Sequence, residues 1–330
     1  MKSLCLVLPL AALTTAAITF AQSAAPNPFA VSADRMDKIK AAMPAVTPAP
    51  VKKKHEVLVF TKTTTFRHGS IPSGVECMKQ LGAKTGLFNV THTEDPAVFE
   101  PDSLKKFDGV VFLNSTGTPL ADKSGEERNG LSPEQQKEIE SSENRRKDAL
   151  VAFVKGGKGL VGIHSGGDTY NDWKDYAEMM GTGFVEHPWN SGDTVRVKNL
   201  DPKHPLTAAF KGEGFTIKDE IYKFKPGRAL PSERRMLLAL DPDGTDMMKD
   251  DKNKDGKPDR ELYPIAWLST YGQGRSFYCS LGHNDEVFWN PMVVEHYLAG
   301  IQYALGDLPA DAAPKPVALL LKEGRLIAAH

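Results

Sequence analysis

A glycine-flanked turn in the first half of the chain presents a histidine. The stretch VGIHSGG, residues 161–167, follows an apolar run and has the form G-x-nucleophile-x-G, in which serine or cysteine usually takes the central position. Here the central residue is His164, and the glycines at 162 and 166 allow the sharp turn. A histidine so exposed acts as a general base or as a metal ligand through a neutral ring nitrogen. The alternative is a histidine that only caps the next helix; we favour a function because the turn exposes this position.

Two further segments carry side chains suited to the same chemistry. Arg67 and His68 follow the first apolar run, where a guanidinium can hold an anion or a pair of sugar hydroxyls and an imidazole can titrate near neutral pH. Asp219 and Glu220 precede another strand, and only one of them can point into a site because adjacent strand residues face opposite sides. We expect that one to be Glu220. The alternatives are an ordinary charged loop for the first pair and a solvated pair for the second.

Histidines in two other segments complete the candidate set. His283 lies in GHND at the end of an apolar run, and His187 lies in EHPW beside Trp189. The face of a sugar stacks well on an aromatic ring, so Trp189 is a candidate carbohydrate contact. We expect His187, Trp189 and Asp168, which follows the elbow, to bind substrate. A packed loop is the alternative for the EHPW segment.

Strands and helices alternate through residues 54–167 and position these candidates. Apolar runs predict strands, and helical spacing predicts helices; the strands are 55–62, 88–95, 107–116 and 158–167 (with the elbow), and the helices are 73–86 and 131–157. Ser132 as N-cap, Pro133 at the first helical position and glycines at 156 and 157 bound the second helix. The pattern predicts a doubly wound, parallel α/β sheet, whose sites lie at the carboxyl ends of the strands. The segments 63–70, 114–120 and 164–169 then share one rim.

The pattern changes after Gly183. The segments 193–200, 215–225 and 234–241 alternate like partly exposed strands, and 264–283 is typical of a hairpin that turns at Gly272–Gly274. A closing amphipathic helix is predicted at 290–306, and the tail at 308–330 can dock as a late strand. The expected class is therefore α/β, with a doubly wound, mostly parallel sheet and added β-hairpin elements.

The start of the chain predicts export and a tether. Residues 1–21 have one early lysine, a short apolar run and small residues at 19 and 21, which indicates a cleaved export signal, with an uncleaved anchor as the alternative. Residues 22–53 are rich in Ala and Pro and predict a tether before a domain at 54–307. The protein is then periplasmic or extracellular, without a membrane span after signal removal. The formal net charge of −1 gives no basic field for nucleic acid.

A polar insertion at 241–267 contains a further pattern. Its segment DKNKDGKPD puts oxygen-bearing side chains and a glycine at positions 1, 3, 5, 6 and 9 of an EF-hand-type loop, namely Asp251, Asn253, Asp255, Gly256 and Asp259. Oxygens at alternate positions wrap a hard cation, and the glycine allows a sharp turn. The twelfth position is Leu262 instead of a bidentate glutamate, and no flanking helices are evident. We predict a weak or structural calcium site, with a solvated hairpin tip as the alternative.

The motifs together resemble one protein family. FRHGSI, GIHSGGDT, EHPW, KDEIYKF and PIAWLSTYGQGRSFYCSLGH resemble the ThuA-like (trehalose-utilisation) family, over about residues 54–307. The resemblance implies a flavodoxin-like fold similar to that of class I glutamine amidotransferases. Those enzymes have a cysteine where this chain has His164, so glutaminase chemistry is not implied. The resemblance also implies sugar metabolism with oxidised 3-keto sugars as substrates, and it gives weight to His68, His164, His187, Glu220 and His283 as pocket positions.

Residues and resemblance together predict an exported enzyme that acts on a sugar or an oxidised sugar, as a hydrolase, lyase or isomerase. In one version a divalent ion such as Zn²⁺ binds imidazoles from His68, His164 and His283 together with Glu220, and it polarises a carbonyl or activates water. In a metal-free version one histidine abstracts the proton next to a sugar ketone and Arg67 stabilises the enolate. No nucleotide cofactor is expected. The rival class is a non-catalytic carbohydrate-binding or scaffold protein that uses the same pocket.

Overall fold

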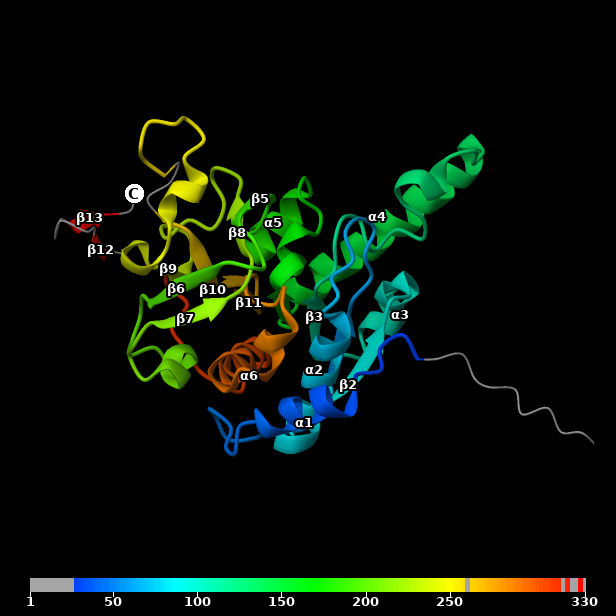
Figure 1. The fold of residues 1–330 in the computed structure, drawn as a ribbon. Helices are drawn as coiled ribbons and strands as arrows, with labels where there is room; N and C mark the ends of the chain where they lie inside the picture. Colours follow the sequence, from blue (N-terminus) through cyan, green and yellow to red (C-terminus); the bar gives the residue numbers. More distant parts are fainter. Residues whose placement is uncertain (1–26, 259–261, 316–317, 321–325, 329–330) are drawn as a thin grey trace, which may run out of the picture.

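A nine-stranded sheet forms the centre of the molecule and has helices on both faces (Figure 1). The computed structural model describes residues 27–258, 262–315, 318–320 and 326–328. The strands of this sheet are β1 (His55–Phe60), β2 (Phe88–Thr93), β3 (Gly109–Leu113), β4 (Gly159–Ile163), β6 (Thr194–Asn199), β7 (Phe215–Lys218), β9 (Arg235–Leu240), β10 (Pro264–Tyr271) and β11 (Gly274–Cys279). The α-helices are α1 (Ala33–Ala41), α2 (Ile71–Thr85), α3 (Pro101–Leu104), α4 (Pro133–Lys155), α5 (Lys174–Met180) and α6 (Pro291–Leu305).

The parallel half of the sheet arises from the predicted alternation of strands and helices. β1 pairs in parallel with β2 and β3, β3 pairs with β4, and β4 pairs with β11, which gives the order β2-β1-β3-β4-β11. β3 and β4 are buried along their whole length, as expected for strands that are covered on both faces. This 2-1-3-4-5 order is that of flavodoxin-like folds. The predicted fold class is therefore confirmed.

Four antiparallel strands extend the sheet beyond β11, in the order β10-β9-β6-β7. The predicted hairpin at 264–283 is confirmed, because β10 and β11 pair antiparallel with Tyr271 opposite Gly274. Gly272 in the turn has φ of 61°, and a Cβ on it would lie 2.8 Å from the Lys155 Cα at the end of α4. The turn therefore needs glycine both for its backbone angle and for its close packing.

The long helix α4 has the predicted ends. The Ser132 hydroxyl accepts from the Gln135 backbone N–H at 3.3 Å, and the Gln135 side chain accepts from the Ser132 N–H at 2.9 Å, which makes a capping box. The carboxyl-terminal part of the helix buries Leu150 and Val154 against the sheet, whereas its amino-terminal end projects from the body of the molecule (Figure 1). This helix covers the face of the sheet opposite to α2 and α6.

A second, two-stranded sheet carries two of the candidate residues. β5 (Phe184–Trp189), which the sequence did not predict as a strand, pairs antiparallel with β8 (Ile221–Phe224) outside the main sheet. The segment 215–225, predicted as one strand, is divided at Asp219 and Glu220: β7 stays in the main sheet and β8 leaves it. The break places Glu220 directly before β8, and His187 lies in the facing strand.

Part of the segment that was predicted to be a tether packs on the domain instead. Residues 33–41 form α1, with Ser32 as N-cap, and α1 lies against α2 (Figure 1). Ile39 is fully buried, and Ala49 exchanges two hydrogen bonds with the Gln302 side chain of α6, at 3.0 and 2.9 Å. The amphipathic spacing of ADRMDKIKAAM produces an apolar helix face. Because this face packs on the domain, the segment folds although its Ala/Pro-rich surroundings are typical of a tether. This part of the segment therefore belongs to the folded body.

Ile39→Ala should lower the free energy of unfolding by about 2–5 kcal/mol, because it leaves a cavity where a side chain is fully buried. Val46→Ala is the matched control: Val46 is 78% exposed. Its loss should change the free energy by less than about 0.5 kcal/mol. Urea unfolding followed by circular dichroism measures both values. Equally small effects in the two variants would contradict the packing of α1.

The described strands of the carboxyl-terminal tail form a small sheet of their own. β12 (Ala318–Leu320) and β13 (Leu326–Ala328) pair only with each other, so these tail strands do not extend the main sheet.

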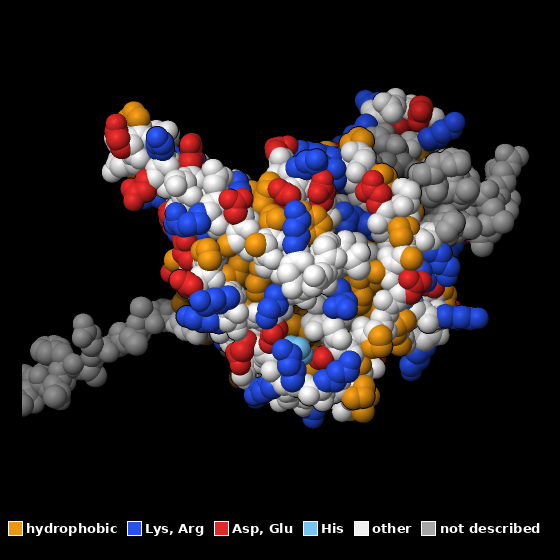
Figure 2. Space-filling view, turned by 180° about the vertical axis from the view of Figure 1, so that it is seen from behind, with side chains coloured by type: hydrophobic (Ala, Val, Ile, Leu, Met, Phe, Trp, Pro, Cys, Tyr) orange, Lys and Arg blue, Asp and Glu red, His pale blue; other side chains and the backbone are white. Residues whose placement is uncertain are grey.

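The predicted export signal at 1–21 lies outside the described residues. Within the described part of the chain, no helix has both the length and the apolar character needed to cross a bilayer. Figure 2 shows basic and acidic side chains interspersed over one face, in keeping with the net charge of −1.

Candidate metal centre

Side chains from four separate segments meet at the carboxyl-terminal rim of the parallel strands. His68 follows β1, His164 follows β4, His283 follows β11 and Glu220 precedes β8. One nitrogen from each imidazole and one oxygen of the Glu220 carboxylate lie within 4.8 Å of one another. His283 is partly exposed and the other three residues are buried. The structure thus brings together the four residues that the sequence predicted as one ligand group, here named the His3Glu cluster.

The backbone at His164 has the strained conformation of a nucleophile elbow. Its φ of 48° lies in the left-handed region that residues other than glycine rarely occupy. Tyr278 of β11 donates its hydroxyl to the His164 carbonyl at 2.7 Å. Gly166 packs so closely on β3 that a Cβ would lie 2.6 Å from the Phe112 carbonyl oxygen. These contacts hold the strained turn, which directs an imidazole into the His3Glu cluster where other folds direct a nucleophile.

Hydrogen bonds determine which ring nitrogens face the cluster. His164 Nδ1 donates to the Ser280 carbonyl at 2.7 Å; because a carbonyl only accepts, Nε2 of the neutral ring carries the lone pair. This Nε2 lies 3.1 Å from Nε2 of His68, whose Nδ1 contacts the Ser165 hydroxyl at 3.1 Å. Burial and the neighbouring imidazoles of His164 and His283 lower the pKa of His68 to about 2. His68 therefore stays neutral and keeps a lone pair at physiological pH.

The Glu220 carboxylate contacts three imidazoles. Its Oε2 lies 3.5 Å from His164 Nε2 and 3.1 Å from His283 Nδ1, and its Oε1 lies 3.3 Å from His187 Nδ1. Burial acts to raise the pKa of Glu220, but His164 and His283 outweigh it and hold that pKa well below its usual range. Burial acts to lower the pKa of His283, but the Glu220 carboxylate outweighs it, so this pKa is raised. The cluster therefore contains one ionised carboxylate.

Asp219 holds the loop that carries His283. It is fully buried and accepts from the backbone N–H groups of Gly282 and Asn284, at 2.7 and 2.9 Å. Burial raises the pKa of Asp219 in spite of these bonds. As predicted for adjacent residues, only Glu220 faces the cluster. No role was predicted for Asp219 from the sequence, although a second carboxylate beside a candidate ligand was the available signal.

A second contact holds the same loop from the other side. The Gly282 carbonyl accepts from the Asn114 amide at 3.1 Å and from the Ser70 hydroxyl at 2.9 Å. Asn114 follows β3, is fully buried and has φ of 50°. Gly282 has φ of 137°, and a Cβ on it would lie 3.1 Å from the His164 Cβ. The sequence predicted only that segment 114–120 lies at the rim of the sheet. This location brings Asn114 close enough to hydrogen-bond to the loop that carries His283.

Comparison with known proteins identifies the family. The sequence matches the family model ThuA, described as trehalose utilisation, over residues 56–304. The chain belongs to the ThuA family. A crystal structure of a ThuA-like protein from Bacteroides uniformis has a TM-score of 0.54 and 18% identity, covering 79% of this chain and 93% of that one. Another, from Parabacteroides merdae, has a TM-score of 0.51 and 18% identity over 81% and 95% of the two chains. At this identity the likeness shows the fold alone. No curated protein matches the sequence.

Two residues predicted for the substrate site of this ThuA protein touch or border the His3Glu cluster. The side chain of His187 is 44% exposed and reaches Glu220. Asp168 ends the elbow turn, and its carboxylate accepts from the Asn171 amide at 2.7 Å. Burial raises the pKa of Asp168, and the charges of His164 and His187 act on it as well. His187 therefore contacts the cluster directly, and Asp168 lies at the end of the turn that carries His164.

Two other predicted residues lie elsewhere in the ThuA fold. Trp189 is 1% exposed, its ring packs edge-on against Tyr263, and its Nε1 donates to the Asp246 carbonyl at 2.9 Å, so it offers no face to a sugar. Arg67 turns away from the cluster, because it pairs with Glu94 at 2.7 Å. Trp189 was expected to stack on substrate because of its position beside His187. Strict alternation along β5 would put residue 189 on the same face as His187, but the β5–β8 pairing shifts register between Glu186 and Trp189 and the indole is buried in the core instead.

The two described cysteines lie in buried positions. Cys77 is in α2 and Cys279 is in β11, and both are free and buried. Burial raises the pKa of Cys279 to about 12. Neither residue offers the exposed thiolate that glutaminase chemistry requires.

The predicted calcium loop lies apart from the His3Glu cluster. The Asp251 carboxylate accepts from the backbone N–H groups of Asp255 and Gly256, at 3.1 and 3.0 Å. Gly256 has φ of 76°, which is the sharp turn that the pattern requires. Asn253 lies in the same turn, and Asp259 lies outside the described residues. Calcium binding by this loop stays a prediction.

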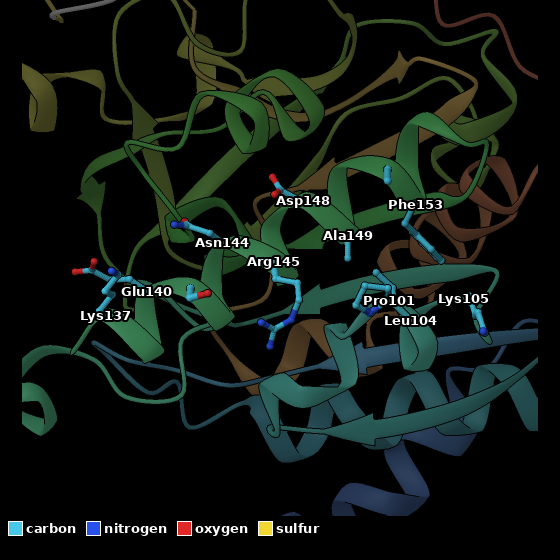
Figure 3. Close-up of a pocket in the computed structure, with 12 residues that line it drawn as sticks. Pro101, Leu104, Lys105, Lys137, Glu140, Asn144, Arg145, Asp148, Ala149 and Phe153 are labelled. Atoms are coloured by element: carbon cyan, nitrogen blue, oxygen red, sulfur yellow. The ribbon is translucent and has the colours of Figure 1, made fainter. Parts of the chain in front are cut away.

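A broad groove on another face is separate from the candidate centre. It lies between α3 and α4, where Leu104, Ala149 and Phe153 line its apolar part (Figure 3). Arg145 reaches from α4 to Glu100 and forms a two-pronged ion pair at 2.6 and 2.9 Å. No member of the His3Glu cluster lines this groove.

The donors of the His3Glu cluster fit a divalent cation. Three imidazole nitrogens and a carboxylate oxygen form the kind of set that binds zinc and similar ions. Nδ1 of His283 is buried and lies 3.1 Å from the Glu220 Oε2. A histidine that binds a metal usually donates its other N–H to a carbonyl or carboxylate, as His164 does to Ser280. Two imidazole nitrogens that face each other at 3.1 Å need a proton or a cation between them.

Proposed function

We propose that this ThuA protein is an exported, metal-dependent enzyme that acts on the carbonyl group of an oxidised sugar, such as a 3-keto glycoside. The observation that carries the proposal is the meeting of three imidazole nitrogens and one carboxylate oxygen within 4.8 Å. The family description, trehalose utilisation, supports a sugar as the substrate. The reaction is of the lyase, isomerase or hydrolase type, because each of these can begin at an activated ketone.

The ligand set favours zinc or a similar first-row ion over calcium or magnesium, which prefer oxygen ligands alone. When bound, the ion polarises the sugar carbonyl. His68, His164 and His283 would hold it through ring nitrogens, and Glu220 would supply the one negatively charged ligand.

Proton transfer falls to the side chains that border the cluster. His187 is half exposed and contacts Glu220 Oε1 at 3.3 Å, so it can exchange protons with solvent while its ring is oriented. We assign it as the base that removes the proton next to the ketone. Burial raises the pKa of Asp168, and its carboxylate, which accepts from the Asn171 amide at 2.7 Å, can also accept from a sugar hydroxyl.

The position of Arg67 is the reason to prefer the metal-dependent version. The metal-free version needs a cation beside the developing enolate, and Arg67 was the residue predicted to supply it. Arg67 is engaged with Glu94 at 2.7 Å, and its guanidinium lies over the Phe29 ring, 5.8 Å from its centroid. Without Arg67, a bound cation in the His3Glu cluster is the source of positive charge.

Metal removal tests the proposal. The purified protein is incubated with 3-keto-trehalose before and after treatment with a chelator, and its metal content is measured by elemental analysis. We expect turnover to fall on the order of 100-fold and to return when zinc or another divalent ion is restored, because the ion supplies several kcal/mol of charge stabilisation. Unmodified trehalose is the control substrate, because it has no ketone for the ion to polarise.

Two outcomes contradict the proposal. Turnover that persists in protein shown to be free of metal excludes the metal from the reaction. Binding of 3-keto-trehalose by the metal-loaded protein without any product favours the rival class, a non-catalytic carbohydrate-binding or scaffold protein.

A further inference from the structure

Phe66 is a large apolar side chain that stays exposed beside the His3Glu cluster. The residue is 61% exposed. Its ring lies edge-on to His68, with centroids 4.7 Å apart, and nearly parallel to His283, with centroids 6.3 Å apart and an interplanar angle of 21°. Single exposed apolar residues are normal on protein surfaces. This one differs because its ring contacts two imidazoles of the cluster, so water-exposed aromatic surface borders the candidate metal centre.

The loop that presents Phe66 is tied to the loop after β3. The Thr64 N–H donates to the Thr116 carbonyl at 3.1 Å, and the Thr116 hydroxyl donates to the Phe66 carbonyl at 3.0 Å. Gly117 lies so close that a Cβ on it would clash with the Thr64 hydroxyl, which also accepts from the Thr118 N–H at 2.8 Å. The exposed ring therefore stands on an ordered backbone. A ligand that rests on it would not have to order a mobile loop first, which favours binding.

Hydrogen-bonding groups of the cluster lie beside the Phe66 ring. Arg67 leaves the loop in another direction and pairs with Glu94, so it does not cover the Phe66 ring. On the cluster side lie imidazoles and the Glu220 carboxylate, and half-exposed His187 adds a further hydrogen-bonding group. An apolar ring next to hydrogen-bonding groups matches a pyranose, which has an apolar C–H face and a rim of hydroxyls. Trp189, the aromatic residue predicted for this role, lies in the core.

We propose that Phe66 is the platform on which the reacting sugar ring stacks through its C–H face, with its oxygens turned toward His187 and the His3Glu cluster. This inference rests on the proposed function, because it assumes that the ligand of the cluster is a sugar. The ring that stacks is the reacting ring and not its neighbour, since Phe66 contacts two of the imidazoles that would hold the metal. Phe66 then contributes to substrate binding and leaves metal binding to the other residues.

The test compares substitutions of Phe66 by isothermal titration with two probes, methyl 3-keto-α-glucoside and 3-keto-trehalose. Phe66→Ala should weaken the binding of both by about 10- to 100-fold, because it removes the surface on which the ring is buried. Phe66→Tyr should keep the wild-type affinity, and Phe66→Leu should be intermediate, because leucine keeps apolar area but no flat ring. Metal content should be unchanged in all three. Val46→Ala, another exposed apolar residue, is the control and should bind as the wild type does.

The outcomes separate this inference from the proposed function. If Phe66→Ala binds both probes as tightly as the wild type, the sugar does not stack on Phe66. This result would contradict the inference even if turnover depends on metal. If it loses affinity only for the disaccharide, the stacked ring is the neighbouring sugar and the assignment to the reacting ring is wrong. Loss of metal in Phe66→Ala would show a structural role instead. If metal-free wild type still turns over 3-keto-trehalose and Phe66→Ala loses affinity for both probes, the platform stands and the metal-dependent function fails.

Discussion

His164→Ala should remove the bound metal and lower kcat/KM for 3-keto-trehalose on the order of 1,000-fold. The imidazole is fully buried at the centre of the His3Glu cluster, and its Nε2 lies 3.1 Å from His68 and 3.5 Å from Glu220. Its loss removes a ligand and one of the three imidazoles that contact the Glu220 carboxylate, so several kcal/mol of transition-state stabilisation are lost. Elemental analysis and steady-state kinetics measure the two effects.

A second substitution and a control make this result interpretable. Residue 164 has φ of 48°, which strains alanine, so His164→Asn should fold better and still lose the metal, because asparagine tolerates the left-handed backbone. His92→Gln is the control: it removes a partly buried histidine of β2 that hydrogen-bonds with Thr61 outside the cluster. We expect it to keep metal and activity. Full metal content in folded His164→Asn would contradict the assignment of this ligand.

Asp219→Asn should weaken metal binding by about 10- to 100-fold, the range typical of residues that orient metal ligands. Asp219 accepts two backbone N–H groups, from Gly282 and Asn284, and so fixes the loop that presents His283. An asparagine amide can accept one of these bonds but must turn its NH2 group toward the other donor. His283 would then lose its position relative to Glu220. Competition titration with a coloured chelator measures the affinity.

Two further measurements separate a positioning role of Asp219 from general destabilisation. Thermal melting of the metal-free variant reports the loss of fold stability alone. Asp250→Asn is the matched control, because Asp250 is an equally buried carboxylate that binds Lys223 and Tyr263 away from the cluster. We expect Asp250→Asn to lower the melting temperature without changing metal affinity. Equal metal affinities in the Asp219 and Asp250 variants would contradict the role of Asp219 in positioning His283.

The sequence predicted the parallel half of the fold because its signals are local. Apolar runs define β1, β3 and β4, and Ser132 with the glycines at 156 and 157 defines α4. Once these strands form one parallel sheet, the segments after them must share a rim. The convergence of His68 and His164 was therefore predictable from strand order alone. His283 joins them because β11 pairs with β4, as a hairpin next to the parallel strands allows.

The parts that were not predicted depend on long-range pairing. Nothing local in 215–225 shows that β7 and β8 enter different sheets, yet this break is what turns Glu220 to the cluster and Asp219 to the 282–284 loop. Likewise, the side of β5 on which the Trp189 side chain lies depends on how β5 pairs with β8. The packing of α1 depends on a surface of α2 and α6 that composition does not report, so the Ala/Pro content of 22–53 predicted a tether where residues 33–49 fold onto the domain.

An anomalous diffraction map recorded at the zinc absorption edge from crystals of the zinc-loaded protein would show whether the His3Glu cluster binds a metal ion. We expect one strong peak among His68 Nε2, His164 Nε2, His283 Nδ1 and a Glu220 oxygen, at about 2.0–2.2 Å from each. His164 Nδ1 should still donate to the Ser280 carbonyl. A map without a peak at this place, in crystals in which the two Nε2 atoms remain in hydrogen-bond contact, would contradict the metal centre.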